Sequence, residues 1–418
     1  MSWRRHLADT RPLQNPYFRR LWLANIVTVI GAQLTIVAVP AQIYLITGSS
    51  AYVGLTGLFG LVPLVVFGLY GGALADVFDR RRLLILTTWG LIITTAGFWI
   101  QAALGNQNVW VLLWLFAAQQ ACFAVNQPTR SAVLPKILPA DQLPAANSLS
   151  MTLFGAGAVA GPLLGGALIP VLGFAWLYFL DTVSLFATLW AVTCLPSLAV
   201  EGAKGRAGVR SVIDGLLYLR GHPVLLMSFV VDLIAMFFGM PRALFPEVAE
   251  SSFGGPPGGG LAYAVLFAAM PAGMVLGGVL SGWVSRVQRQ GLAVVASIVV
   301  WGLAVVALGA VVIVADGPSM TLLALAAVAL AVGGAADMAS AAFRTSMLQA
   351  SASDAVRGRL QGVFIVVVAG GPRLADVAHG AASPVIGPGW TITAGGVLTV
   401  IGVLVAAAVV PAFVRYRP

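Results

Sequence analysis

The amino-acid sequence predicts an all-α membrane protein whose twelve transmembrane helices form two pseudo-symmetric bundles of six. Only 9% of the 418 residues are charged and 59% are hydrophobic, whereas a typical soluble domain carries about 25% charged residues. Apolar runs near the ~20 residues needed to cross a bilayer recur from end to end. The two halves of the chain also repeat each other. A membrane protein is therefore expected rather than a soluble enzyme.

The predicted spans follow a basic, polar N-terminal stretch that shows no cleavage signal, so we expect the first span to be retained. A polar stretch after the sixth span divides the chain into an N-terminal bundle (1–200), a linker (201–222) and a C-terminal bundle (223–418). The spans cover residues 21–46, 53–75, 83–104, 109–131, 146–171 and 174–196, then 224–247, 261–284, 291–314, 319–344, 362–385 and 389–413.

The positive charges indicate how the chain is oriented. All Lys and Arg except Arg242 and Arg373 lie at the termini, in the linker, or in or beside the loops on that same side. Because cytoplasmic loops collect Lys and Arg, we expect both termini in the cytoplasm and the protein in the cell inner membrane, in contact with lipids. This pattern accounts for the net charge of +9, so binding to nucleic acid is not expected. A monomer is expected.

The internal repeat is an ordered series of identical residues at nearly constant offsets. Two halves in the same orientation indicate parallel repeats related by an axis along the membrane normal, with the substrate site between them near the midplane. The matched pairs include Gly72 with Gly278, Arg80 with Arg286, Arg130 with Arg344, Gly166 with Gly380 and Trp176 with Trp390.

Two motifs resemble the major facilitator superfamily. The stretch from Gly72 to Arg82 looks like that family's loop between helices 2 and 3, with Asp79 where glycine is usual. A glycine-rich run looks like the helix-5 motif of the family's exporters; it contains Gly157, Gly161, Pro162, Gly165 and Gly166. Nearly the whole chain resembles the family, and the enterobactin (siderophore) exporter branch is most similar in segments 18–43, 71–82, 266–271, 347–349 and 358–359. The resemblance implies the major facilitator fold and alternating access driven by proton entry.

The same resemblance assigns a gating motif rather than a substrate site to Gly72, Asp76, Arg80, Arg81 and Arg130. Asp76 would cap neighbouring helix ends when the cytoplasmic side is closed, since helix N-termini favour negative charge. The arginines would pair with cytoplasmic acids or lipid phosphates. Positive-inside topology alone would explain the arginines, but not Asp76 together with Gly72.

Ionisable residues inside the spans are candidates for proton coupling, because a charge at the bilayer centre costs about 2.5–3.5 kcal/mol on insertion scales. Arg373, Asp376 and His379 are spaced i, i+3 and i+6, which places them in one slanted stripe of a helix. We hypothesise that Asp376 exchanges protons while Arg373 and His379 tune its pKa. The alternative is a static Arg373–Asp376 pair. Asp337 either faces a cavity or pairs with Arg344 near the end of its span.

Two further charged residues have two interpretations each. Asp232, a proton-coupling candidate, corresponds to Asn25 across the repeat, so both could share a cavity position or could bond to neighbouring helices. Arg242 lies near the outer end of its span. It either attracts an anionic substrate or pairs with Glu247 or Glu250.

A polar stripe in the span 109–131 predicts further cavity residues. Gln119, Phe123, Asn126 and Arg130 follow helical spacing. A helix that faced lipid on all sides would not carry so many amides. Gln33 in the first span is interpreted in the same way. Hydrogen bonding between helices is the alternative for all of these amides.

Together these features predict a proton-coupled secondary active exporter in which the two bundles rock around a central site. No G-x-x-x-x-G-K-[ST] phosphate loop occurs, so ATP is not expected to drive it. The three His and two Cys are dispersed, so neither a metal nor a cofactor is expected. The resemblance implies a siderophore or similar amphipathic small molecule as cargo. A multidrug efflux antiporter, and a lipid-translocating or non-transporting membrane partner protein, remain as alternatives.

Overall fold

The computed structural model describes residues 9–198, 217–351 and 354–417, with side chains for all of these except 69–77 and 350–369. The described part is helical almost throughout and contains no strand. The first half forms η2 (Arg11–Gln14), α1 (Pro16–Thr47), α2 (Ser50–Val77), α3 (Arg80–Ala103), α4 (Val109–Ile137), η3 (Ala140–Gln142) and α5 (Leu143–Thr193). The second half forms α7 (Pro223–Phe238), η4 (Arg242–Leu244), α8 (Phe245–Ser251), α9 (Leu261–Val279), η5 (Ser281–Arg286), α10 (Gln290–Val314), α11 (Met320–Ser351), α12 (Asp354–Ile386), α13 (Pro388–Val409) and α14 (Pro411–Val414).

The helices confirm the membrane fold. In the described residues, ten segments are long and apolar enough to cross a membrane. One of them contains α5, which Gly173 breaks at a φ of 74°, a backbone conformation that glycine adopts without strain. This segment therefore makes the two crossings predicted at 146–171 and 174–196. A further helix, α12, has 33 residues, enough for about 50 Å at 1.5 Å per residue. With these two additions the helices account for the twelve expected crossings.

The seventh span differs from the single helix predicted at 224–247. It is interrupted between α7 and α8, with Gly239 at the end of α7 and the short η4 in between. Pro241 contributes to the break because proline has no amide hydrogen and clashes with the preceding helical turn. The Gly239 carbonyl freed by the break accepts a hydrogen bond from Trp301 Nε1 at 3.1 Å. Broken helices of this kind form the substrate sites of many transporters.

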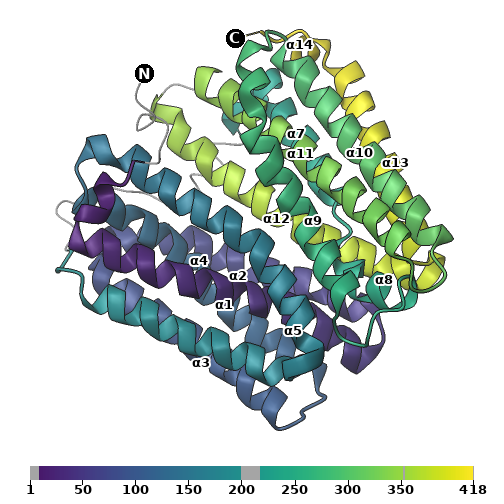
Figure 1. Ribbon diagram of the computed structural model, residues 1–418. Helices are drawn as coiled ribbons and strands as arrows, with labels where there is room; N and C mark the ends of the chain where they lie inside the picture. The colour runs from purple at the N-terminus through teal and green to yellow at the C-terminus, as the bar shows by residue number, and fades with distance from the viewer. Residues whose placement is uncertain (1–8, 199–216, 352–353, 418) are drawn as a thin grey trace, which may run out of the picture.

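The packing of the helices forms two bundles (Figure 1). In the first half α1 and α3 pack against α5, and α2 packs against α4; in the second half α10 packs against α13 and α11, and α11 packs against α9. The main contacts between the halves are α2 with α12 and α5 with α9. Figure 1 shows both termini at the same end of the molecule, which an even number of crossings requires. Most of the predicted linker lies outside the described residues.

The outer surface of the bundles is apolar in a way that fits lipid rather than water. Large side chains such as Leu86 (69% exposed) and Ile93 (66% exposed) point outward. The buried face of α1, by contrast, carries Val37, Ala38 and Ile43, all at 0%. Soluble monomers rarely expose large apolar patches. The core therefore lies where the helices meet, and the outer faces are suited to a bilayer.

Candidate functional site

A cavity of about 250 Å³ lies between the two bundles. Both halves contribute to it, through α1 and α5 on one side and the broken segment after α7, α9, α10 and α11 on the other. Two of the predicted cavity residues, Gln33 and Arg242, line it. The rest of the lining is mainly apolar and includes Met240, Met270, Met274, Phe245, Phe267 and Trp301.

Arg242 reaches the cavity because the helix is broken immediately before it. Its Nη2 lies 2.7 Å from Oδ2 of Asp376 on α12, to which it donates a hydrogen bond. The Arg242 side chain is 43% exposed, whereas that of Asp376 is 6% exposed. The other carboxylate oxygen, Oδ1, is buried and accepts no hydrogen bond. The guanidinium is thus held by a buried carboxylate and remains open to the cavity. Neither Glu247 nor Glu250 forms an ion pair with it.

The predicted stripe on α12 is divided among different partners. Asp376 pairs with Arg242, so the static Arg373–Asp376 pair is not formed. Arg373 instead donates from Nη2 to Gln120 Oε1 of α4 at 2.7 Å, which joins the two halves. The ring of His379 lies between two carbonyl oxygens, with Nδ1 2.9 Å from Ala375 O and Nε2 3.1 Å from the carbonyl that ends α7. A neutral imidazole can donate to only one of them.

A second ionisable cluster lies in the C-terminal bundle. Asp232 of α7 forms an ion pair with Arg344 of α11, and Asp337 has these two groups as its charged neighbours. Arg344 also donates from Nε to Ser340 Oγ at 3.2 Å. The predicted alternative of a direct Asp337–Arg344 pair is not formed, because Arg344 turns to α7. This packing could not be deduced from spacing along α11.

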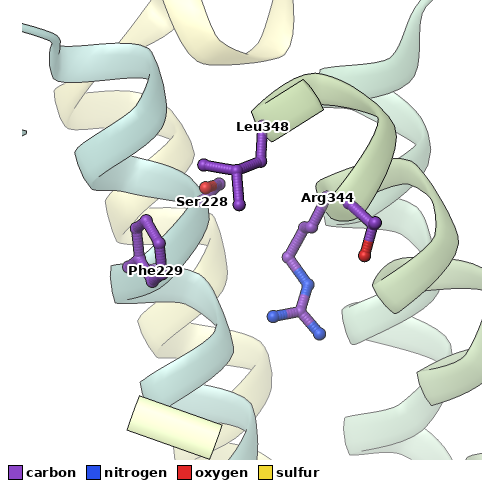
Figure 2. Close-up of a pocket in the computed structure, with 5 residues that line it drawn as sticks. Ser228, Phe229, Arg344 and Leu348 are labelled. Atoms are coloured by element: carbon purple, nitrogen blue, oxygen red, sulfur yellow. The ribbon is translucent and has the colours of Figure 1, made fainter. Parts of the chain in front are cut away.

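A small cavity of about 10 Å³ adjoins Arg344. Figure 2 shows Arg344 and Leu348 of α11 facing Ser228 and Phe229 of α7 across it. Its volume is close to the smallest that holds one water molecule, roughly 10–15 Å³. A polar molecule of that size can therefore approach the guanidinium.

The polar stripe on α4 is only partly a cavity surface. Asn126 is 7% exposed and donates to Thr87 Oγ1 of α3 at 2.8 Å, so hydrogen bonding between helices is the correct interpretation for it. Gln119, Phe123 and Asn25 do not line the cavity. Of the amides in the predicted set, only Gln33 does so.

The helix-5 motif brings α5 close to its neighbours. A Cβ at Gly157 would collide with Val29 of α1, one at Gly161 with Gln33, and one at Gly165 would touch Leu34 and Val37. Gly166 faces the other half instead, where its Cβ would lie 2.7 Å from Ala264 of α9. Pro162 lines the cavity. The motif therefore permits close packing of α5 with α1 and with the opposite bundle.

The halves are joined at the end opposite the termini. Glu247 of α8 accepts hydrogen bonds from Ser50 of α2 at 2.5 Å and from Ser383 of α12 at 2.7 Å. The Gly260 amide before α9 donates to the Gly166 carbonyl at 2.8 Å. One carboxylate thus connects both halves at this end.

The predicted gating motif lies near the termini. Arg80 donates to the Ala132 carbonyl of α4 at 3.3 Å, and Arg81 donates to the Thr193 carbonyl at the end of α5 at 2.6 Å. Gly72 and Asp76 belong to α2, but their side chains lie outside those described. Arg130 lies near the same end of α4. These contacts connect helices within the N-terminal half.

Asp79 caps α3, which explains an acid where the family usually has glycine. Its Oδ1 accepts from the amides of Arg81 at 2.8 Å and Arg82 at 3.2 Å, and its Oδ2 accepts from Ser197 Oγ at 2.6 Å and from the Leu198 amide at 3.2 Å. Burial acts to raise the pKa of Asp79, but these hydrogen bonds outweigh it and hold the pKa below its ordinary value. The cap ties α3 to the segment after α5.

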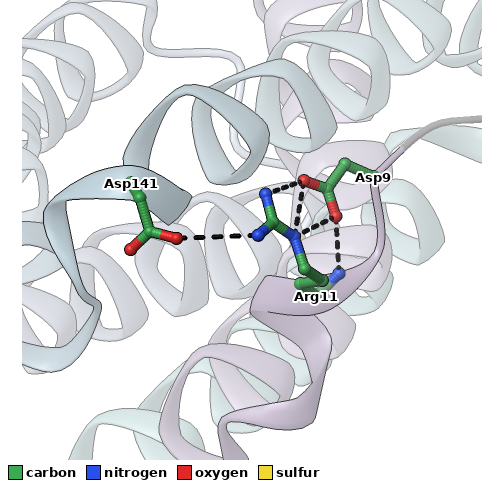
Figure 3. A network of polar contacts seen from close by, with 3 residues as sticks. All are labelled: Asp9, Arg11 and Asp141. Atoms are coloured by element: carbon green, nitrogen blue, oxygen red, sulfur yellow. Dashed lines mark hydrogen bonds and ion pairs between the residues drawn. The ribbon is translucent and has the colours of Figure 1, made fainter.

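A third polar group at this end is exposed. Figure 3 shows Arg11 between Asp9 and Asp141, which precede η2 and α5 respectively. The Arg11 Nη2–Asp9 Oδ2 distance is 2.7 Å and the Arg11 Nη1–Asp141 Oδ2 distance is 3.6 Å. Because exposed ion pairs contribute little stability, we assign this group a local role in positioning the N-terminal segment.

Three residues join the candidate site although they were not among the predicted site residues: Gln120, Glu247 and Arg344. The sequence named Arg344 and Glu247 only as alternative partners of Asp337 and Arg242. Arg344 is the counterpart of Arg130 across the repeat, and Gln120 directly follows Gln119 of the polar stripe of α4. Those were the available signals.

Comparison with known proteins agrees with this architecture. Residues 8–414 match the model of the transmembrane secretion effector family. The enterobactin exporter EntS of Escherichia coli strain UTI89 is 26% identical over 392 residues, covering 93% of this chain and 91% of that protein. These findings confirm the resemblance to the siderophore-exporter branch.

Solved structures of transporters have the same fold. A POT family transporter in complex with 5-aminolevulinic acid superposes with a TM-score of 0.74 at 12% identity, covering 95% of this chain and 96% of that one. A bacterial homologue of the iron transporter ferroportin in an inward-facing state gives 0.69 at 14% identity, covering 96% and 99%. The expectation of a transporter rather than an enzyme is confirmed. This chain is a multi-pass membrane transporter and belongs to the transmembrane secretion effector family of the major facilitator superfamily.

Proposed function

We propose that the protein is a proton-coupled exporter that works by alternating access and carries a siderophore or a similar amphipathic anion. The observation that carries this proposal is Arg242, a cation held at the wall of an otherwise apolar cavity between the two bundles. With the termini in the cytoplasm, as the charge distribution predicts, the contacts of Glu247 close the outer side. The cavity is then placed to receive cargo from within.

The charge of the cavity favours an anionic cargo over a lipophilic cation. Arg242 is the charged residue in the lining, whereas Asp376 is 4% exposed and lies behind it. A cationic drug would require an acid on the cavity surface. Methionine and aromatic side chains supply adaptable apolar contacts for the rest of the molecule. The curated relative named an enterobactin exporter supports a catecholate siderophore as the first compound to test.

Arg242 also connects cargo binding to the buried carboxylate of Asp376. In a medium of low dielectric constant a buried carboxylate needs its counter-ion. When an anionic group of the cargo binds Arg242, it competes with Asp376 for the guanidinium. Departure of the cargo restores the Arg242–Asp376 pair. In this proposal the Arg242–Asp376 pair sets the affinity for cargo.

The test is proton flux in proteoliposomes under an imposed pH gradient. A catecholate siderophore should trigger flux in the wild type and in the exposed control Asp316→Asn. Flux should be lost when Arg242→Gln is combined with Asp376→Asn, a double substitution that removes the cation without leaving a buried charge unpaired. Flux triggered only by a lipophilic cation would establish multidrug efflux instead. No flux with either compound would refute proton-coupled export and favour lipid translocation or a non-transporting partner role.

A further inference from the structure

The cluster of Asp232, Asp337 and Arg344 is unbalanced in charge. Asp232 is 0% exposed, Asp337 3% and Arg344 7%. Asp232 has Arg344 as its ion-pair partner, whereas Oδ1 of Asp337 is buried and accepts no hydrogen bond. Two carboxylates therefore share one guanidinium in a buried site.

Among the described side chains, those of the neighbouring elements supply no second cation. Helices α9, α10, α13 and α14 carry no Asp, Glu, Lys, Arg or His, and the phenol of Tyr263 lies at the far end of α9. Arg286 of η5 is exposed. On α12, Arg373, Asp376 and His379 lie at the level of the large cavity, and the side chains of Asp354, Arg357 and Arg359 lie outside those described. In the described part of the chain, Arg344 is thus the only positive charge acting on both acids.

The cluster lies between the two cavities. On α7, Asp232 precedes Gly239 of the large cavity by seven residues, about 10 Å at 1.5 Å per residue. On α11, Asp337 follows Gly333 of the same cavity by four residues, about 6 Å. Arg344 then borders the small cavity nearer the termini. Neither acid lines the large cavity, so a cargo bound there at Arg242 does not contact them directly.

Export in exchange for protons needs such a separate site. Protonation of Asp376 frees Arg242 and strengthens the binding of an anion, and by reciprocity the anion strengthens the binding of that proton. If a proton and the cargo each strengthen the binding of the other, the transporter carries both in the same direction. Exchange requires that the two occupy the protein in turn, and a proton site away from Arg242 allows this.

We propose that Asp232, Asp337 and Arg344 form a binding site for one proton, and that this proton is the one exchanged for cargo. The second statement rests on the proposed function; the first does not. Protonation of one carboxyl leaves one carboxylate for Arg344 and makes the cluster neutral. Loss of that proton, toward the side that carries the termini, leaves one buried negative charge without a partner.

The binding site is tested on the full chain in detergent without cargo, by thermal unfolding from pH 5 to pH 9 in choline salts. Wild type should lose stability as the pH rises, by up to about tenfold in the unfolding equilibrium constant per pH unit for one proton. Asp337→Asn and Asp232→Asn each leave one acid for one arginine, so each should remove this slope. Asp316→Asn, an exposed acid, should retain it.

Infrared spectroscopy gives a second measurement that a merely structural role would not affect. The difference between wild type and Asp337→Asn should contain the carbonyl band of a protonated carboxyl. Absence of this band, or a wild-type pH profile in both Asn variants, would refute the proton site. If sodium but not choline restores wild-type stability at high pH, the site binds a monovalent cation and the proton assignment is wrong.

Transport then separates this inference from the proposed function. If the wild type shows no cargo-driven proton flux, the export proposal is contradicted. The proton site is then judged by thermal unfolding and infrared spectroscopy alone. Flux that is present in wild type and undiminished in Asp337→Asn would refute the role of the cluster in exchange while export stands. Loss of flux in Asp337→Asn, with cargo binding retained, is the expected result.

Discussion

Removal of Arg242 should destabilise the protein in a manner that depends on pH. Arg242→Gln leaves Asp376 at the same place, with a side chain that is 6% exposed and without its ion-pair partner. A buried carboxylate in that position must be protonated for the protein to remain folded. The cost of the substitution is therefore the cost of keeping a proton on Asp376.

The magnitude follows from proton linkage. In the unfolded chain an Asp has a pKa of about 3.9, so holding it protonated at pH 7 costs about 4 kcal/mol at 1.36 kcal/mol per pH unit. At pH 5 the same requirement costs about 1.5 kcal/mol. The first figure agrees with the roughly 3–5 kcal/mol lost when one partner of a buried pair is removed. Access of water to the cavity would reduce both values.

The assay is a double-mutant cycle with Asp376→Asn, followed by denaturation in mixed detergent micelles at pH 5 and pH 7. Arg242→Gln should be much less stable than wild type at pH 7 and should recover most of the loss at pH 5. The double variant should be more stable than Arg242→Gln at pH 7, because no carboxylate is left unpaired. Equal losses at both pH values, or a double variant no more stable than Arg242→Gln, would refute the buried pair.

Three further predictions concern packing, the closed end and a helix cap. Gly166→Leu should cost about 1–3 kcal/mol of stability from overpacking, since its Cβ would lie 2.7 Å from the backbone of α9. Gly68→Ala, with open space around it, should be neutral. Similar unfolding midpoints for the two variants would contradict this prediction. Glu247→Gln should speed hydrogen exchange in α8 by weakening two charge-assisted hydrogen bonds, whereas Glu250→Gln should not. Equal exchange rates in wild type and both variants would contradict the role of Glu247 in joining the two halves. Asp79→Ala should cost about 0.5–2 kcal/mol at pH 7. Because the folded pKa of Asp79 is lowered, the stability that the cap contributes is present above about pH 3.9 and disappears as the pH falls through the folded pKa. If the stabilities of wild type and Asp79→Ala still differ by the same amount in acid, this contribution of the Asp79 carboxylate is excluded.

Much of the architecture could be predicted from local sequence. Hydropathy is summed over about 20 consecutive residues, so the spans could be recognised without knowledge of their neighbours. The exporter branch could be recognised for a similar reason, because its motifs are short continuous segments. The two crossings of α5 were predicted as separate spans, and Gly173 lies between them. The break after α7 was missed, although Gly239 and Pro241 are both present there.

The candidate residues were identified by type, but their partners were not. A charge inside a span is visible in the sequence, and so Asp232, Asp337 and Asp376 were singled out. The partner of Asp376 proved to be Arg242, 134 positions away, rather than Arg373 on the same helix. Asn126 proved to bond to α3 rather than to face the cavity.

The sequence by itself determined that this chain crosses a membrane in two repeated halves, to which family it belongs and which charges lie in the membrane. The tertiary structure alone decided which charges meet and which one faces the cavity. The reason is physical: span, repeat and motif are properties of neighbouring residues, whereas an ion pair between α7 and α11, or between η4 and α12, depends on the rotation and approach of whole helices. Contacts such as that of Gly166 with α9 set that approach.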